Sequence, residues 1–201
     1  RGVDSLDGGD GFDIVSFASD ADQGMEVNLQ TGLITNDGFG NAETMISIES
    51  VQGTSIFHDT VNGSGNNDII IVSGADNTVF GRNGDDIITI DGGGGAIDGG
   101  SGTDTLQLSG VLFVDTGEDI VETVAAAPVV IDLAAEAITN DGFGGSGSLI
   151  RVENVNTSVG IDTADTITGS AFNNVINTHG GDDTVNAGGG NDTVGGGAGD
   201  D

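Results

Sequence analysis

The sequence predicts an all-β fold, a parallel β-roll or β-solenoid in which two internal copies follow one plan. Three observations carry this prediction: a nine-residue period, an apolar residue at a fixed position of that period, and a long duplication at an offset of 104 residues. Internal periods of this kind are typical of solenoids, because each repeat buries its apolar side chains only against its neighbours.

The period of nine is clearest over residues 54–107. The successive blocks read TSIFHDTVN, GSGNNDIII, VSGADNTVF, GRNGDDIIT, IDGGGGAID and GGSGTDTLQ. Their eighth position is always aliphatic, their sixth is mostly Asp, and glycine gathers at positions one to four. The aliphatic residue predicts a short strand with one buried face, and the glycines permit the positive φ angles of a tight turn. The register returns over 160–201 and, more briefly, in GGDGFDIVS at 8–16.

Two blocks make one coil of eighteen residues, so the acidic turns should alternate between the two sides of a flattened solenoid. One side should stack Asp68, Asp86 and Asp104, and the other Asp59, Asn77 and Gly95. Stacked coils lie about 4.8 Å apart, and two carboxylates at that distance repel by roughly 3 kcal/mol at an effective dielectric of about 20. A column of carboxylates therefore requires cations. Calcium fits, because it takes roughly six to eight oxygens from carboxylates and from the carbonyls that glycine turns expose.

The charge balance points to the same cation. The chain has 33 acidic residues against three arginines, with no lysine, and its formal charge is -30. A compact state with that charge repels itself unless cations neutralise it. Disorder is the alternative, but it gives no reason for a phased apolar column.

The same composition excludes several partners and sites. It argues against nucleic acid and anionic membranes, and no apolar run is long enough for membrane insertion. The absence of cysteine excludes disulfides and thiolate metal sites. Because the chain begins without Met or a signal peptide, we expect it to be a piece of a longer protein.

The blocks resemble the RTX, or hemolysin-type, calcium-binding repeat, a nonapeptide of the form GGxGxDxUx. GGSGTDTLQ at 99–107 and AGGGNDTVG at 187–195 match that form closely. The resemblance implies that the sixth-position Asp binds calcium together with turn carbonyls and with the turn one coil further on. The ligands that it implies for the best site are Asp86 and Asp104 with the carbonyls of Gly81, Asn83, Gly99 and Ser101.

The resemblance implies further sites along each tract. Their residues are Asp68 with Asp86, Asp165 with Asp183, Asp183 with Asp201, Asn174 with Asp192, and Asp13 in the opening block. The pair of Asn174 and Asp192 should be weaker, because Asn carries no charge. The column of Asn77 and Gly95 departs from the repeat, so we expect no calcium there.

A longer duplication divides the chain into two copies. VNLQTGLITNDGFG at 27–40 returns as IDLAAEAITNDGFG at 131–144, and MISIESV at 45–51 returns as LIRVENV at 149–155. We interpret 1–107 as one copy and 108–201 as the other, each a strand-rich segment of wider coils followed by a nonapeptide tract, at 54–107 and 160–201. The shared Asn-Asp-Gly predicts a tight turn, with a calcium ligand at Asp37 and Asp141 as the alternative. Residues 108–128 are compatible with a loop, a short helix or an extra strand.

Nothing in the sequence indicates an active site, and we expect no enzyme. The two histidines, His58 and His179, occupy variable positions of the repeat and have no evident partner. Glu49 and Glu153 recur at equivalent places in the two copies, which suggests a structural role such as bonding a neighbouring turn.

The expected function is that of a calcium-binding module, with several Ca²⁺ ions as its partners. By the family resemblance it would belong to a secreted bacterial protein, exported by type I secretion and folding on calcium outside the cell. The alternative is a structural repeat unit of a large adhesin, surface-layer or filament protein, in which neighbouring copies stack end to end.

Overall fold

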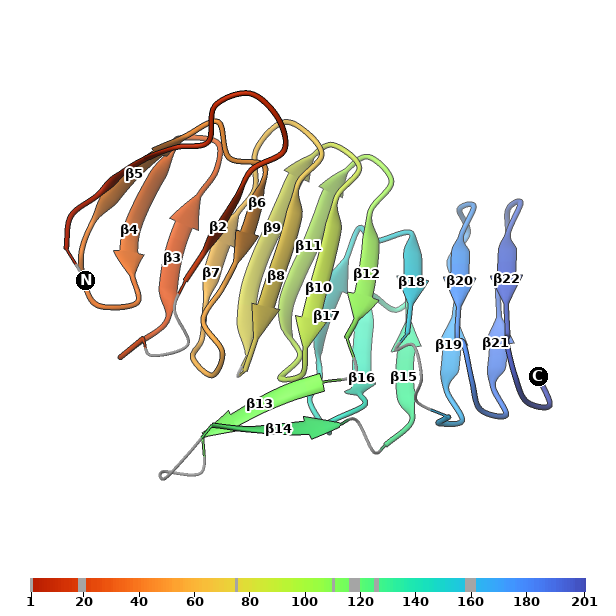
Figure 1. Cartoon of the computed structure of the whole chain (residues 1–201). Coiled ribbons are helices and arrows are strands. Elements are labelled where there is room, and N and C mark those ends of the chain that lie inside the picture. Colours follow the sequence, from red (N-terminus) through yellow and green to blue (C-terminus); the bar gives the residue numbers. More distant parts are fainter. Residues whose placement is uncertain are drawn as a thin grey trace.

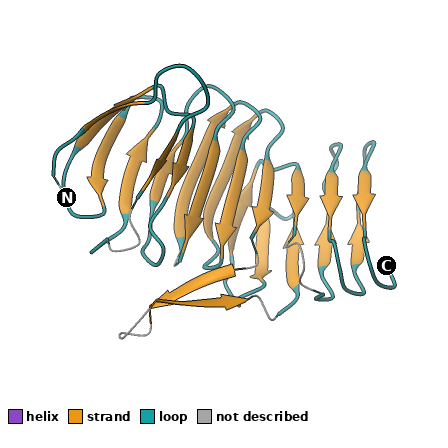
Figure 2. Ribbon diagram, in the orientation of Figure 1, coloured by secondary structure: helices purple, strands orange, loops and turns teal. Residues whose placement is uncertain are grey.

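Two facing β-sheets make up most of the molecule, and a small hairpin lies beside them (Figure 1). The computed structural model describes residues 2–17, 21–74, 76–109, 111–115, 120–124, 127–157 and 162–201. Every regular element in these ranges is a strand, as Figure 2 shows, so the prediction of an all-β solenoid is confirmed. No helix of the described residues is long and apolar enough to cross a membrane.

The larger sheet has twelve strands. In spatial order they are β1 (Ser5–Asp7), β5 (Glu43–Ile46), β4 (Leu33–Asp37), β3 (Met25–Asn28), β7 (Thr60–Asn62), β9 (Asn77–Asn83), β11 (Gly95–Ser101), β17 (Gly147–Ile150), β16 (Ala137–Asp141), β15 (Val129–Asp132), β19 (Thr166–Thr168) and β21 (Thr184–Asn186). The smaller sheet has eight strands, all parallel. They are β2 (Ile14–Ser16), β6 (Ser50–Gln52), β8 (Ile69–Ser73), β10 (Ile87–Asp91), β12 (Thr105–Leu108), β18 (Asn154–Asn156), β20 (Val175–Asn177) and β22 (Thr193–Gly195).

The nonapeptides alternate between the two sheets, so that two of them complete one coil. Ile87 of β10 pairs with Ile69 of β8 on one side and with Thr105 of β12 on the other, a spacing of eighteen residues in each direction. The opposite sheet keeps the same spacing, since Thr60 of β7 pairs with Thr78 of β9. The predicted eighteen-residue coil is therefore present in the central tract.

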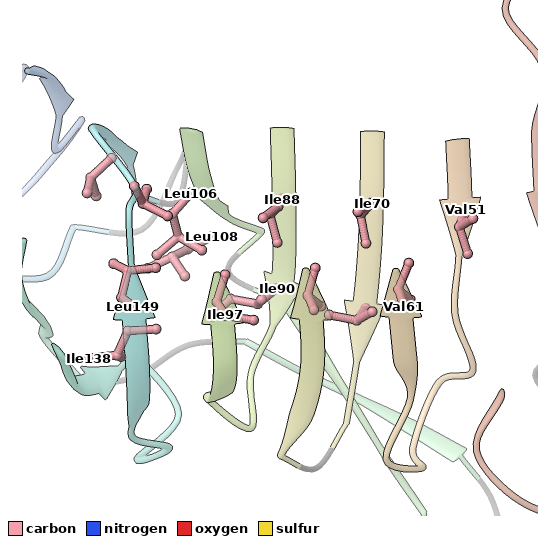
Figure 3. Packing of buried hydrophobic residues seen from close by; sticks show 14 of the residues in the cluster. Val51, Val61, Ile70, Ile88, Ile90, Ile97, Leu106, Leu108, Ile138 and Leu149 are labelled. Carbon is pink, nitrogen blue, oxygen red and sulfur yellow. The ribbon is translucent and has the colours of Figure 1, made fainter. Parts of the chain in front are cut away.

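The core is a thin double row of aliphatic side chains between the sheets (Figure 3). The eighth residues of the central blocks are all fully buried, at 0% exposure: Val61, Ile70, Val79, Ile88, Ile97 and Leu106. Burial of one such side chain stabilises the fold by about 1.5–3 kcal/mol. The row thins toward the C-terminus, where Val185 is partly buried and Val194 is 47% exposed. Apolar burial is therefore weakest in the last coil.

The strand-rich segments repeat with high fidelity. Strands β3, β4, β5 and β6 recur as β15, β16, β17 and β18 with all bounds shifted by 104 residues. Parallel pairing of β11 with β17 and of β12 with β18 joins the first tract to the second segment in the same two sheets. The division of the chain at residue 107 stays a prediction, because the copies share one core.

The strand-rich segments differ from the expected parallel coils in one respect. β4 runs antiparallel to β3 and β5, and β16 does the same in the second copy. Only residues 29–32 separate β3 from β4, and a parallel return needs a crossover of roughly a dozen residues, whereas a hairpin does not. Gly32, at a φ of 66°, closes that turn.

Two segments named in the sequence analysis lie partly outside the described residues. Within 108–128, strands β13 (Val111–Asp115) and β14 (Ile120–Val124) pair as an antiparallel hairpin outside the two large sheets. This agrees with the extra-strand alternative, although residues 110, 116–119 and 125–126 lie outside the described ranges. The expected start of the second tract, residues 160–161, lies outside them as well.

Candidate metal centre

The acidic turns form one continuous column along the edge of the eight-stranded sheet. A residue with a carboxylate or amide side chain stands directly before each strand. In spatial order these residues are Asp13, Glu49, Asp68, Asp86, Asp104, Glu153, Asn174 and Asp192. Neighbours are linked through the main chain: the amide of Asp68 donates to Asp86 Oδ1 at 2.8 Å, and the amide of Asp86 donates to Asp104 Oδ1 at 2.9 Å. These three residues lie in one stack, as the period of nine predicts.

The links to Asp86 and Asp104 each use one carboxylate oxygen and leave the other available. Asp13, Asp86, Asp104 and Asp183 each have a buried Oδ2 without any hydrogen-bond partner among the described residues. Asp86 and Asp104 are fully buried as residues. A buried charge without a partner is costly, and such groups are paired or bind metal ions in native proteins. These oxygens are therefore the strongest candidates for metal ligands.

Glycines at the first position of the turns bring carbonyl oxygens to the same place. A Cβ atom added to Gly81 would lie 2.4 Å from Asp86 Oδ2 and 2.4 Å from the carbonyl oxygen of Gly99. One added to Gly99 would lie 2.6 Å from Asp104 Oδ2 and 2.3 Å from the carbonyl oxygen of Arg151. The cradle thus requires glycine, and its oxygens converge on one point. Such an all-oxygen donor set fits calcium.

The remaining predicted ligands of the best site lie on neighbouring strands. Asn83 of β9 and Ser101 of β11 are register partners, and the carbonyl of Ser101 accepts the amide of Gly84 at 3.0 Å. The structure therefore brings together all six residues predicted for this site, which are Gly81, Asn83, Asp86, Gly99, Ser101 and Asp104. Their assignment as ligands stays a prediction.

Two kinds of turn precede the short strands of the nonapeptide tracts. In the first kind, positions two and four both have positive φ angles. The pairs are Gly9 with Gly11, Arg82 with Gly84, Gly100 with Gly102, His179 with Gly181, Gly188 with Gly190, and Gly197 with Gly199. All four buried, unpartnered carboxylate oxygens named above belong to turns of this kind. The positive φ angles explain the glycine-rich half of the repeat, since only glycine adopts them without strain.

Serine closes the second kind of turn. The amide and hydroxyl of Ser64 both donate to the carboxylate of Asp68, and in the second copy the amide of Ser170 donates to Asn174 Oδ1 at 2.8 Å. The side chain that would face an ion is thus used inside its own turn. The predicted pairs Asp68–Asp86 and Asn174–Asp192 each have one such turn, so each has fewer oxygens for a metal than the Asp86–Asp104 pair.

The opposite column of the central tract is satisfied without metal. Asp59 accepts bonds from the amide of Met25 and from both the amide and the hydroxyl of Thr54. Asn77 accepts the amide of Asp59 at 2.8 Å and donates to the carbonyl of Ser73 at 3.2 Å. The side chains of these buried residues are therefore occupied by hydrogen bonds within the chain. That no calcium binds in this column stays a prediction.

The C-terminal tract continues the carboxylate stacking on that opposite side. The amide of Asp165 donates to Asp183 Oδ1 at 2.8 Å, and the amide of Asp183 donates to Asp201 Oδ1 at 3.2 Å. Asp165 also accepts the amide of Val129 and the hydroxyl of Thr163, so its carboxylate is more occupied than that of Asp183. Asp201 is exposed. In the column of the eight-stranded sheet, the amide of Asn174 donates to Oδ1 of the partly buried Asp192 at 2.9 Å.

Burial raises the pKa values of the central carboxylates. Burial, together with the neighbouring Asp104 and Asp68 carboxylates, raises the pKa of Asp86 to about 7. Burial raises the pKa of Asp104 to about 6, with Glu153 as the main additional charge. Burial also raises the pKa of Asp165. Each of these groups is most stable with either a proton or a cation beside it.

Two predictions about single residues can be compared with the contacts. Glu153 Oε2 accepts the amide of Asp104 at 2.8 Å, and Glu49 Oε2 accepts the amide of Asp13 at 3.0 Å. Both glutamates thus bond a neighbouring turn, as their duplication suggested. Sequence reasoning missed that they are members of the acidic column, because the turns before them are shorter than a nonapeptide turn. The recurring position of a Glu directly before a strand was the available signal.

The Asn-Asp-Gly heptamer forms the predicted tight turn. Asp37 Oδ1 accepts the amides of Phe39 and Asn41, and its Oδ2 accepts the side-chain amide of Asn41, all at 2.9 Å. Burial opposes ionisation of Asp37, but these bonds bring its pKa below the ordinary value. Asp141 is bonded in the same way and also accepts the amide of Gly94 at 3.0 Å. Both carboxylates are therefore occupied by the turn itself, which favours the turn over the calcium alternative.

The fold and the site together define a calcium-binding β-solenoid. Among the described residues no three His, Asp or Glu side chains gather as a metal cluster, so an ion between turns must take many of its ligands from main-chain carbonyls. The family model of the RTX calcium-binding nonapeptide repeat matches the chain four times, at residues 1–23, 54–88, 159–194 and 179–201, which together cover just over half of it. The chain belongs to this family, and its repeats bind calcium. A comparison with curated proteins found no match.

Proposed function

We propose that the chain is the calcium-binding module of a secreted bacterial protein, and that it folds when it meets calcium outside the cell. The observation that supports this most directly is the set of buried carboxylate oxygens of Asp86, Asp104 and Asp183, which have no hydrogen-bond partner among the described residues. They lie in a chain with a formal charge of -30 and a thin aliphatic core. Without cations, repulsion along the column opposes folding.

Calcium would supply the positive charge that lets the column stack, and the residues of the chain determine where that charge lies. Gly81 and Gly99 let carbonyl and carboxylate oxygens approach one point, while the links between turns hold each sixth-position side chain in place. Because the ligands of one ion come from consecutive coils, binding and folding are coupled. Extracellular calcium modules bind at roughly 10⁻⁴–10⁻³ M, a range that would keep the chain unfolded where calcium is scarce.

The module itself is proposed to be non-catalytic. Of its two histidines, His179 bonds the Asn156 side chain at 2.6 Å and stands at a turn position with positive φ, a structural setting. Four aspartates with raised pKa values, Asp59, Asp86, Asp104 and Asp165, each stand directly before a strand of a nonapeptide tract. Their place in the repeat therefore accounts for the raised pKa values without a catalytic role.

Isothermal titration calorimetry with calcium and with magnesium tests the proposed function. We expect several calcium ions to bind with coupled folding, and magnesium to bind at least about tenfold more weakly. Magnesium requires near-ideal octahedral geometry and gives up its water reluctantly, whereas these turns offer many carbonyls in a wide cage. Equal affinities for the two ions, or no calcium binding at all, would contradict the proposal.

A further inference from the structure

We propose that a calcium ion also binds at each junction where a nonapeptide turn meets a strand-rich segment, with Glu153 and Glu49 as ligands. This inference rests on the proposed function, because it extends the calcium column beyond the repeats. The Glu153 junction, formed by Gly99, Asp104, Arg151 and Glu153, lies wholly outside the residues that match the family model.

The Glu153 junction has the same geometry as the regular site beside it. In the regular site, the amide of Asp86 donates to Asp104 Oδ1, and the cradle at Gly81 is closed by Asp86 Oδ2 and by the Gly99 carbonyl. At the junction, the amide of Asp104 donates to Glu153 Oε2 at 2.8 Å. The cradle at Gly99 is closed by Asp104 Oδ2 and by the carbonyl one coil further on.

That further carbonyl belongs to Arg151, so Arg151 takes the place of the first glycine of a turn and Glu153 takes the place of the sixth-position Asp. Asp104 Oδ2 is buried and has no partner among the described residues. Glu153 uses only Oε2 in its bond to Asp104, which leaves Oε1 for an ion. The oxygen that requires a cation and the ligands that would complete its site are thus present together.

The first copy carries the same arrangement independently. The amide of Asp13 donates to Glu49 Oε2 at 3.0 Å, and Asp13 Oδ2 is buried without a partner among the described residues. A Cβ atom on Gly8 would lie 2.0 Å from the carbonyl oxygen of Ser47. Ser47 and Arg151 have φ angles of 52° and 49°, uncommon for residues other than glycine. Because Ser and Arg have different side chains, we infer that this conformation is needed to direct the backbone carbonyl and not the side chain.

The length of the turn explains why these positions carry Glu. Asp98 pairs with Ile150 and Thr105 with Asn154, so six residues, 99–104, face only three, 151–153. In the first copy, residues 8–13 face residues 47–49 in the same way. A three-residue turn leaves less backbone to project toward the neighbouring coil. The extra methylene of Glu restores the reach that Asp has in the longer turn.

The test compares the number of calcium ions bound to the wild-type chain and to Glu153→Gln, measured by equilibrium dialysis with radioactive calcium. Gln keeps an oxygen to accept the amide of Asp104 but loses the charge. We expect Glu153→Gln to bind about one ion fewer at a calcium concentration that saturates the other sites, and Glu49→Gln/Glu153→Gln about two fewer. Circular dichroism at saturating calcium checks that each variant is folded.

Glu26→Gln is the matched control, because Glu26 is exposed on β3 and lies away from the column; it should bind as many ions as the wild type. If Glu153→Gln does not fold, Glu49→Gln in the other copy is judged by the same count. Unchanged stoichiometry and affinity in the folded variant would overturn the junction sites while leaving the proposed function intact. Absence of calcium binding by the wild-type chain would instead overturn the proposed function.

Discussion

Asp86→Asn is expected to raise the calcium concentration at half-folding by at least about tenfold, because the number of charged ligands sets calcium affinity over decades. Asp86 lies between Asp68 and Asp104 in the column and should serve the sites on both sides. Its Oδ1 accepts the amide of Asp68, and its buried Oδ2 has no partner among the described residues. Asn keeps the first oxygen and replaces the second with an amide group, which repels a cation. A calcium titration followed by circular dichroism measures the shift.

Asp85→Asn provides the matched control for this substitution. Asp85 is the adjacent residue and is exposed, and its Oδ1 accepts the amide of Thr103 at 2.8 Å, a bond that Asn preserves. The two variants lose the same charge within one turn, but only Asp86 faces the column. Equal shifts of the calcium midpoint would show that general charge, and not ligation by the sixth-position residue, governs binding.

The metal-free chain is expected to be more stable at pH 5 than at pH 8. In the folded state Asp86 has a pKa of about 7 and Asp104 of about 6, against an ordinary value of 3.8. At pH 5 the folded state therefore holds protons that the unfolded state has released. Its stability falls as the pH rises from about 4 through 7. Far-ultraviolet circular dichroism in calcium-depleted buffers over pH 5–8 measures the folded fraction of the chain, and a folded fraction that rises with pH would contradict the prediction.

Calcium should reverse the direction of this pH dependence. A carboxylate must be deprotonated to bind the ion, so calcium affinity should fall as the pH is lowered from 8 to 6. General repulsion from the net charge also favours the metal-free fold at acid pH. The contribution of the buried column is therefore measured by comparing how steeply the metal-free stability falls with pH in the wild type and in Asp86→Asn. The difference between the two slopes should be largest between pH 5 and 7.

The nonapeptide tracts were the most predictable part of the fold. Their period places an aliphatic residue such as Ile70 or Ile88 at every eighth position, and these side chains are fully buried. The period also predicts the stack of Asp68, Asp86 and Asp104, because eighteen residues bring each turn back to the same side. Local spacing sufficed here, since each coil packs only against its neighbours.

Contacts between distant segments could not be predicted in the same way. The equivalence of Glu153 with Asp104 depends on pairing across 49 residues, and a three-residue turn interrupts the period that reveals the other sites. The antiparallel strands β4 and β16 follow from connections too short for a crossover, within a segment whose alternation alone fits either direction. Nor does the sixth position by itself show that Ser64 occupies the carboxylate of Asp68.

The central claim is that calcium makes this acidic chain fold, and far-ultraviolet circular dichroism of the chain at pH 8 tests it most directly. The spectrum is recorded in calcium-depleted buffer with a chelator, and again after calcium is added in excess to millimolar free concentration. We expect a disordered spectrum without calcium and a β-rich one with it, reversed when the chelator is restored. A chain that is already rich in β-structure without calcium would contradict the account.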